Sequence, residues 1–168
     1  MPVLIRDGKV VPDPWLIVED QDPVLTAIHE GRPLIYPAAS WAEHHPRLRP
    51  RETPVGVWLE GDHEPDVVVP FLRELDLIAI RFGAINDGRG LSLAVLLRTR
   101  YGYGSELRAI GVVYEDLLHY MRRCGFDSFL LPDGRDPATA LELLGGMTDY
   151  YQASVVEPMP AFRRVQRG

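Results

Sequence analysis

The side chains best suited to chemistry lie in one glycine-rich stretch, NDGRGLS, which follows an apolar run. Gly88 and Gly90 would let a ligand approach the backbone closely, and Ser92 can cap the helix that follows. Arg89, two residues after Asp87, could form paired hydrogen bonds with a phosphate, sulfate or carboxylate. The stretch is therefore a candidate anion site. Because Asp-Gly is also a common way to make a tight turn, we favour a purely structural strand-to-helix turn over the anion site.

A second Asp-Gly-Arg sequence precedes a later helix and ends at Arg135. If both turns follow parallel strands, Arg135 and Arg89 lie at the same edge of the sheet, where parallel α/β proteins bind ligands. Two familiar nucleotide loops are excluded. Leu93 replaces the third glycine of a dinucleotide fingerprint, and the only lysine, Lys9, follows an apparent hairpin turn instead of a phosphate loop. Any bound anion would be held by arginines, helix termini or backbone amides.

Glu106 and Arg108 alternate on the same face of a strand, since neighbouring strand residues point to opposite faces. A buried charge is costly unless it is paired and hydrogen-bonded, so these two side chains should lie near the strand start or face a cleft. Two interpretations follow. The pair either fixes the strand to a neighbouring loop, or Arg108 is a second ligand for the anion that Arg89 binds.

The single cysteine, Cys124, excludes an internal disulfide and cysteine-rich zinc or iron–sulfur sites. It lies on an apolar stripe just before a helix C-terminus, where the helix dipole disfavours a thiolate, so we expect a buried, unreactive thiol and not a nucleophile. No complete catalytic set is visible, and we expect no metal site and no cofactor. The histidines show no metal-ligand spacing: His29, His44, His45, His63 and His119.

These residues require a scaffold of alternating strands and helices. The chain opens with two short strands around an Asp-Gly turn, between Val3 and Val11. Apolar runs then predict strands at 34–36, 55–59, 77–82, 107–110 and 126–131. Capping residues, prolines and glycines predict helices at 22–28, 40–46, 64–75, 93–100, 113–124 and 137–144.

Strands of about five residues that alternate with helices of about ten indicate an α/β fold with a mainly parallel sheet. We expect a doubly wound sheet of the flavodoxin or Rossmann kind, with a partial (β/α) barrel as the alternative, because a closed eight-fold barrel normally needs about 250 residues. The 168 residues are expected to form one domain: an N-terminal hairpin (1–14), an α/β core (22–151) and an irregular tail (152–168).

Composition restricts the partners. The net charge of −6 opposes a general nucleic-acid-binding role, because such binding needs a basic face. No segment approaches the roughly 20 apolar residues of a membrane span, and the N-terminus lacks the apolar core of a signal peptide. A cytoplasmic protein without a nucleic-acid or membrane partner is therefore expected.

Two segments, NDGRGLSLAVLLRTRYGYGSELRAIG and MRRCGFDSFLL, resemble the bacterial domain-of-unknown-function family nine-three-four. The family pattern runs F-x-DGRG-x-S-x-A-x-LLR-x-R-x-GY-x-GELRA-x-G, then a helix, then RCGFD-x-F. The resemblance is dense from Phe82 to about Leu131, and the segments at 1–11 and 55–59 are similarly arranged. The matching positions are Asp87, Gly88, Arg89, Gly90, Ser92, Arg98, Arg100, Glu106, Arg108, Arg123, Cys124, Gly125 and Asp127.

The resemblance implies a role in assimilatory sulfite reduction. Family members are described as accessory proteins or oxidoreductases of this process and are usually encoded beside the sulfite reductase haemoprotein. The leading hypothesis is an accessory protein that binds a partner, such as sulfite reductase or another sulfur-assimilation protein. The alternative is a small enzyme or sensor for a sulfated, phosphorylated or carboxylated metabolite, bound through Arg89, Arg108 and Arg135.

The sequence also departs from the family pattern. Val112 stands where members usually carry aspartate, and Leu117 stands where they carry glutamine, while Asp116 is retained. If the missing polar groups line a site in other members, the activity of this protein differs from theirs.

Overall fold

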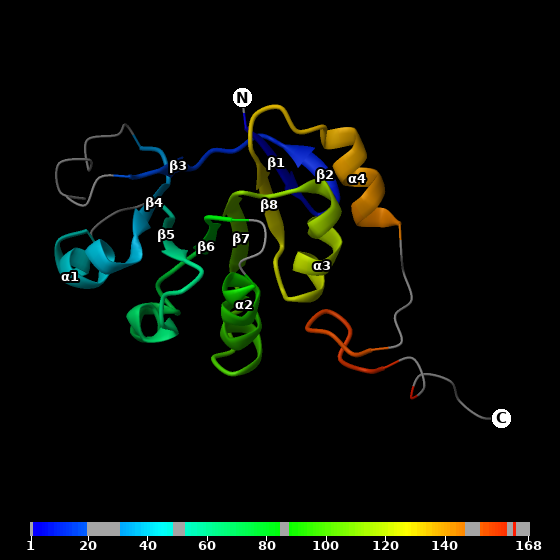
Figure 1. Cartoon of the computed structure of the whole chain (residues 1–168). Helices are drawn as coiled ribbons and strands as arrows, with labels where there is room; N and C mark the ends of the chain where they lie inside the picture. Colours follow the sequence, from blue (N-terminus) through cyan, green and yellow to red (C-terminus); the bar gives the residue numbers. More distant parts are fainter. Residues whose placement is uncertain are drawn as a thin grey trace.

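The computed structural model describes residues 2–19, 31–48, 53–84, 88–146, 152–160 and 163. Its centre is an eight-stranded sheet, curled into a half barrel, with strand order β2-β1-β8-β7-β6-β5-β4-β3 (Figure 1). The expected α/β class with a mostly parallel sheet is confirmed. No helix in the described ranges has the length and apolar character needed to cross a bilayer.

The N-terminal hairpin forms as the sequence predicts. Strands β1 (Val3–Arg6) and β2 (Lys9–Val11) pair antiparallel, and the turn residues Asp7 and Gly8 have φ values of 52° and 69°. Two positive φ angles are what a type I′ turn requires, which explains the Asp-Gly sequence. Strand β1 also pairs antiparallel with β8, so the hairpin extends the parallel sheet by two strands.

The remaining six strands pair in parallel and in chain order. They are β3 (Leu16–Ile17), β4 (Leu34–Pro37), β5 (Val55–Glu60), β6 (Leu77–Phe82), β7 (Glu106–Gly111) and β8 (Ser128–Leu131). Five of them fall on predicted strands, because nearly continuous apolar runs are typical of strands that are covered on both faces. The two-residue strand β3 was not expected.

Four α-helices and three 3₁₀ turns connect the strands. They are α1 (Ala38–Leu48), η2 (Pro65–Val67), η3 (Val69–Phe71), α2 (Arg89–Thr99), η4 (Glu115–Leu117), α3 (Leu118–Arg123) and α4 (Pro137–Gly145). The prediction of a helix at 64–75 is wrong, because Pro70 cannot donate the helical hydrogen bond and its ring crowds the preceding turn. The helix expected at 113–124 is shorter and begins at Leu118. The one expected at 22–28 lies outside the described residues.

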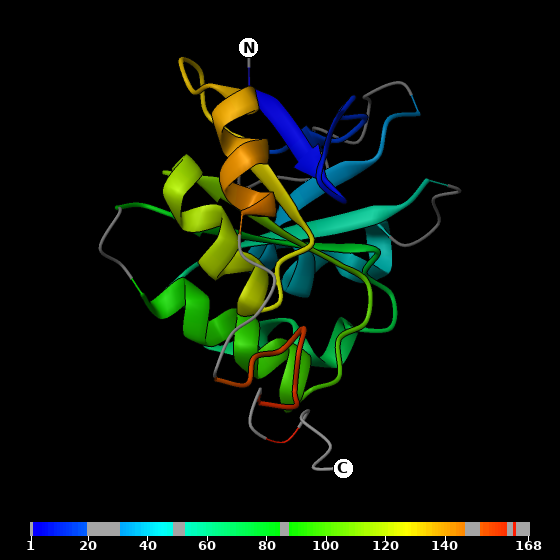
Figure 2. The ribbon, with the colours of Figure 1, turned by 90° about the vertical axis from the view of Figure 1, so that its right-hand side faces the viewer.

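The expected doubly wound order is not found, and the partial barrel is the better description. A doubly wound sheet reverses its strand order at one point, whereas β3 to β8 follow one another without reversal. Right-handed connections that always advance in the same direction place every helix on the same face of the sheet. Figure 2 shows α2, α3 and α4 together on one side of the strands.

The main core lies between this face and the helices. Registered neighbours Tyr36, Val57, Ile78 and Leu107 are fully buried on four adjacent strands. They belong to one cluster with buried side chains of the helices: Ala38, Trp41, Leu93, Ala94, Leu97, Leu118, Met121, Ala140 and Leu144. Single-faced packing therefore fixes the positions of α2 and α3 relative to each other.

On the opposite face, Trp15 and Ile17 pack against a smaller buried cluster: Ile35, Leu77, Ala79 and Ile110. These two residues belong to the segment 12–19, which we call the strap. The strap runs from β2, at one edge of the sheet, to the opposite edge, where its residues 16–17 form β3. A Cβ atom at Gly56 would lie 3.2 Å from the Trp15 ring, so this strand position is suited to glycine. The indole Nε1 of Trp58 donates a hydrogen bond of 2.9 Å to the carbonyl of Val18.

Candidate functional site

The NDGRGLS stretch forms the start of α2. Gly88 is the N-cap residue, and the helix begins at Arg89. Ser92 therefore lies inside the first turn and is not the cap that its type suggested. Asp87 falls outside the described residues.

The glycines of this turn serve the fold. A Cβ atom on Gly90 would lie 2.8 Å from the Phe82 ring, and one on Gly61 would lie 2.8 Å from the Gly90 amide nitrogen. Because Gly90 has no side chain, the Phe82 ring and the loop after β5 can pack directly against its backbone. Only Gly88 has open space where a side chain would be, with nothing within 4 Å. These contacts favour the structural interpretation of the turn.

Arg89 points into solvent beside a carboxylate. Its Nη1 atom lies 3.4 Å from Oδ2 of Asp62, and the two side chains are 63% and 51% exposed. An ion pair this exposed contributes little to stability.

The second Asp-Gly-Arg turn supplies its own anion. Asp136 caps α4 by accepting hydrogen bonds from the amides of Ala138 and Thr139. Hydrogen bonds from Thr139 and Ala138 lower the pKa of Asp136. Arg135 lies over the Tyr114 ring at 3.8 Å, and its Nη1 atom is 3.4 Å from Glu115. The place of an anion at this helix N-terminus is therefore taken by a side chain of the protein.

Arg108 is fully buried inside a charged network. Its Nη1 atom donates to both carboxylate oxygens of Asp13 at 3.0 Å, and its Nη2 atom donates to Glu106 Oε1 at 2.7 Å. Ser128 Oγ donates to the same Glu106 oxygen at 2.6 Å, and Arg6 lies 3.3 Å from the other. Because Asp13 belongs to the strap, this network has the geometry of an ion pair that fixes a strand to a loop.

Neighbouring charges decide the protonation of Glu106. Burial alone would raise the pKa of this carboxyl, but Arg108, the Ser128 hydroxyl and Arg6 outweigh burial and lower the pKa. Glu106 is therefore a carboxylate at neutral pH. The three candidate arginines contact different carboxylates: Arg89 contacts Asp62, Arg135 contacts Glu115, and Arg108 contacts Asp13 and Glu106.

Arg98 forms a second network that the sequence did not single out as a site. From α2, its Nε atom donates to the Gly125 carbonyl at 2.9 Å, and its Nη1 atom donates to the carbonyls of Tyr103 and Ser105. Its Nη2 atom pairs with Asp127, whose carboxylate also accepts the Leu107 amide at 2.8 Å. We call these contacts the Arg98 bracket. The bracket ties α2 to the loop before β7 and to the segment between α3 and β8.

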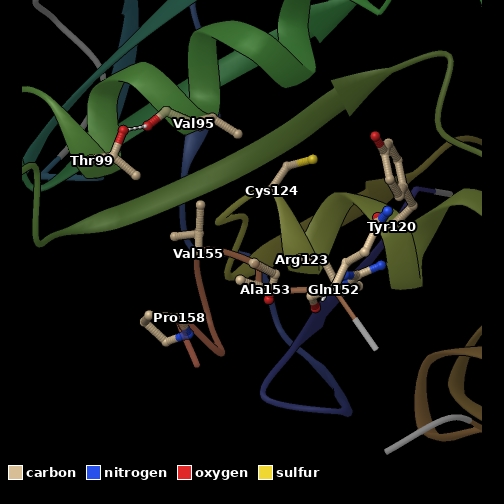
Figure 3. Close-up of a pocket in the computed structure, with 10 residues that line it drawn as sticks. Val95, Thr99, Tyr120, Arg123, Cys124, Gln152, Ala153, Val155 and Pro158 are labelled. Carbon is tan, nitrogen blue, oxygen red and sulfur yellow. Dashed lines mark hydrogen bonds between the residues drawn. The ribbon is translucent and has the colours of Figure 1, made fainter. Parts of the chain in front are cut away.

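Next to the bracket lies an apolar groove between α2 and α3. One hollow, of about 440 Å³, is lined by Val95 and Thr99 of α2, by the C-terminal part of α3 and by residues of the 152–158 segment. Figure 3 shows Val95 and Thr99 on one side of this hollow, with Tyr120, Arg123 and Cys124 on the other. A second hollow, of about 520 Å³, extends along α2 toward Gly88. Because both hollows share Val95, Tyr120 and Cys124, they form one surface, which we call the α2–α3 groove.

The 152–158 segment closes one end of the groove. The Val155 amide donates to the Arg123 carbonyl at 3.0 Å, and the Arg123 guanidinium donates to the Gln152 carbonyl at 3.2 Å. A Cβ atom on Gly125 would lie 3.2 Å from the Val155 side chain. This part of the expected irregular tail is thus held against α3.

Comparison with known proteins identifies one family for this chain. One family model, described as a bacterial protein of unknown function (DUF934), matches residues 56–162. The chain belongs to this family. No curated protein matches the chain. The DUF934 range contains the Arg98 bracket and the α2–α3 groove, whereas the hairpin and the strap precede it.

Cys124 is buried, as the sequence predicted. Cys124 is 8% exposed on the floor of the groove. Burial raises the pKa of its thiol, and the positive charge of Arg123 only partly opposes this rise. The thiol is therefore protonated at neutral pH. Within the described ranges, no group of three or more histidine, cysteine, aspartate or glutamate side chains could hold a metal ion.

Val112 and Leu117 follow the carboxyl end of β7. The Val112 amide donates to the Phe82 carbonyl at 2.8 Å, and Leu117 is half-buried against the main core. Asp116 is exposed on η4. At position 117, an apolar side chain thus contributes packing.

Proposed function

We propose that this protein is a cytoplasmic accessory protein of bacterial sulfite reduction. It acts by binding a protein partner, the sulfite reductase or another protein of sulfur assimilation, and holds no redox cofactor of its own. Family membership supports the process, because the sequence resembles members that are described in this role. The structure supports the mode of action through one feature of its surface.

That feature is the exposed apolar surface of α2 and α3. Leu96 and Tyr120 line the α2–α3 groove with exposed fractions of 38% and 53%. Contiguous apolar surface that is rimmed by polar groups is typical of protein interaction sites. Apolar area that a partner covers favours binding by about 25 cal/mol per square ångström, before the entropic cost of association is subtracted. Both helices lie in the DUF934 range, so the surface belongs to the part of the chain that defines the family.

Co-purification tests this proposal directly. The full chain, tagged at its N-terminus, would be produced in its own host and isolated with and without brief chemical cross-linking. We expect enrichment of the sulfite reductase relative to an unrelated tagged protein of similar net charge. Equal amounts of sulfite reductase in both samples would contradict the proposal.

The other function expected from the sequence is binding of an anionic metabolite at the carboxyl ends of the strands. Its support is weaker, because Arg108 is enclosed by Asp13 and Glu106, and Asp136 occupies the N-terminus of α4. Arg89 is the candidate that remains accessible. Thermal-shift titration with sulfate, sulfite and nucleotide phosphosulfates distinguishes this function from partner binding.

A further inference from the structure

The shape of the α2–α3 groove fits a helix. Its lining residues on α2 recur at intervals of three and four: Gly88, Leu91, Ser92, Val95, Leu96 and Thr99. With a rise of about 1.5 Å per residue, this row is roughly 16 Å long, or about three helical turns. Side chains in such rows form the grooves into which the ridges of another helix pack. An amphipathic helix in a groove is a common mode of recognition.

The charges of α2 and α3 indicate the charge of the partner. Residues 88–105 and 118–125, which include α2 and α3, carry five arginines and no aspartate or glutamate, although the whole chain has a net charge of −6. The 152–158 segment adds one carboxylate, that of Glu157. Arg98 and Arg89 are paired with carboxylates. Arg100 and Arg122 are exposed, and neither has a carboxylate partner among the described residues.

The same charges argue against a second copy of the chain. In a symmetric dimer the same patch meets itself, so the arginines of one α2–α3 surface would face those of the other. Like charges across an interface suppress association, whereas carboxylates opposite them favour it. An acidic helix therefore complements both the apolar lining of the groove and the arginines that α2 and α3 carry.

We infer that the α2–α3 groove is the docking site for an acidic amphipathic helix of the partner protein. The inference rests on the proposed function for the identity of that partner. Apolar side chains of the helix cover Val95, Leu96 and Tyr120, and carboxylates on its flanks pair with Arg100 and Arg122. The 152–158 segment limits the length of helix that the groove accepts.

The first experiment measures binding of purified sulfite reductase to variants of the full chain. Leu96→Glu and Tyr120→Glu place a carboxylate in the groove, and we expect each to weaken binding about tenfold or more, equivalent to about 1.4 kcal/mol. Leu143→Glu is the matched control, because Leu143 is a leucine of similar exposure, 43%, on α4. The affinity of the Leu143→Glu variant for sulfite reductase should stay within about twofold of that of the unchanged chain. All three positions are exposed, so the variants should remain folded, which circular dichroism verifies.

The second experiment uses a synthetic probe. A helical peptide of roughly 18 residues, with leucines along one face and glutamates elsewhere, is compared with a peptide that has lysines in place of the glutamates. Fluorescence anisotropy should show that the acidic peptide binds more tightly and that Leu96→Glu weakens its binding. Equal binding of both peptides, or the same binding by the Leu96→Glu variant, would overturn the inference.

The two experiments separate the inference from the proposed function. If sulfite reductase binds the Leu96→Glu and Tyr120→Glu variants as well as the original chain, the groove inference is wrong and the proposed function stands. If the acidic peptide binds in a Leu96-dependent way but sulfite reductase does not bind, the groove inference stands and the proposed partner is wrong. Failure of both the enzyme and the peptide to bind refutes both.

Discussion

Replacing Arg98 with alanine should destabilise the protein strongly. The substitution removes every guanidinium donor of the Arg98 bracket at once, which leaves the carbonyls of Gly125, Tyr103 and Ser105 and the carboxylate of Asp127 without this partner. The Arg98 side chain is only 12% exposed, so water replaces these bonds incompletely. Its aliphatic stem also packs against Gly125, where a Cβ atom would lie 2.6 Å from Arg98 Cγ.

The size of the effect follows from these contacts. A hydrogen bond to a charged group contributes about 1.5–3 kcal/mol, and the values do not add fully where neighbours share an acceptor. Some carbonyls at the loop surface regain water after the substitution. We therefore expect a loss of about 3–5 kcal/mol in the free energy of unfolding. For a chain of this size the midpoint of thermal unfolding should fall by about 10 °C.

Urea unfolding of two matched variants checks this value. Arg100→Ala makes the same change two residues later on α2, at an exposed arginine whose guanidinium lies 5.6 Å from the Tyr101 ring. It should cost no more than about 0.5–1 kcal/mol. Arg98→Lys should recover only a small part of the stability, because one ammonium group cannot reproduce the planar fork of donors. If Arg98→Ala and Arg100→Ala have similar unfolding free energies, the bracket is not a major source of stability.

Three further predictions concern pH, reactivity and the first turn of α2. The pKa of Glu106 in the folded state lies below its ordinary value of 4.5. The contribution of Glu106 to stability is therefore present above pH 4.5 and is lost as the pH falls through the lowered pKa. Urea unfolding from pH 7 to pH 3 should show this loss, and Glu106→Gln should reduce the dependence of the unfolding free energy on pH. The protonated thiol of Cys124 should react with iodoacetamide at least about tenfold more slowly in the folded protein than in urea, and equal rates would show that the groove floor is open. Arg89→Ala should change the free energy of unfolding by no more than about 0.5 kcal/mol. If sulfate or phosphosulfates raise the thermal unfolding midpoint of the unchanged chain but not of this variant, Arg89 belongs to an anion site.

Local signals in the sequence predicted the elements well, because their causes are local. The hairpin turn follows from Asp7 and Gly8, the start of α4 from Asp136 and Pro137, and strand β6 from one apolar run whose bounds are confirmed. Errors occurred where a local signal was ambiguous. Pro70 occupies a 3₁₀ turn, where the sequence pattern had suggested the first part of a long helix.

The order of the strands could not be read from the sequence, because a single βα unit is the same in a doubly wound sheet and in a half barrel. The two folds differ in which side of the sheet receives the next strand, and long-range packing decides this. The same limit applies to the candidate site. Arg108 and its partner Asp13 are 95 residues apart, so the sequence identified a charged residue in a strand but not the strap that neutralises it.

The contacts of Arg98 and Asp127 gain a common explanation when the Arg98 bracket and the α2–α3 groove are considered together. Arg98 belongs to α2, which forms one wall of the groove, and the Gly125 carbonyl that it binds directly follows Cys124 at the end of the other wall. Asp127 extends the bracket to β7 by accepting the Leu107 amide. The bracket therefore sets the separation of α2 and α3, and with it the width of the groove. In this arrangement Arg98 and Asp127 determine the shape of the docking surface without contacting the partner. A folded protein with a weakened bracket should therefore bind the acidic helix less tightly, even though every residue that lines the groove is unchanged.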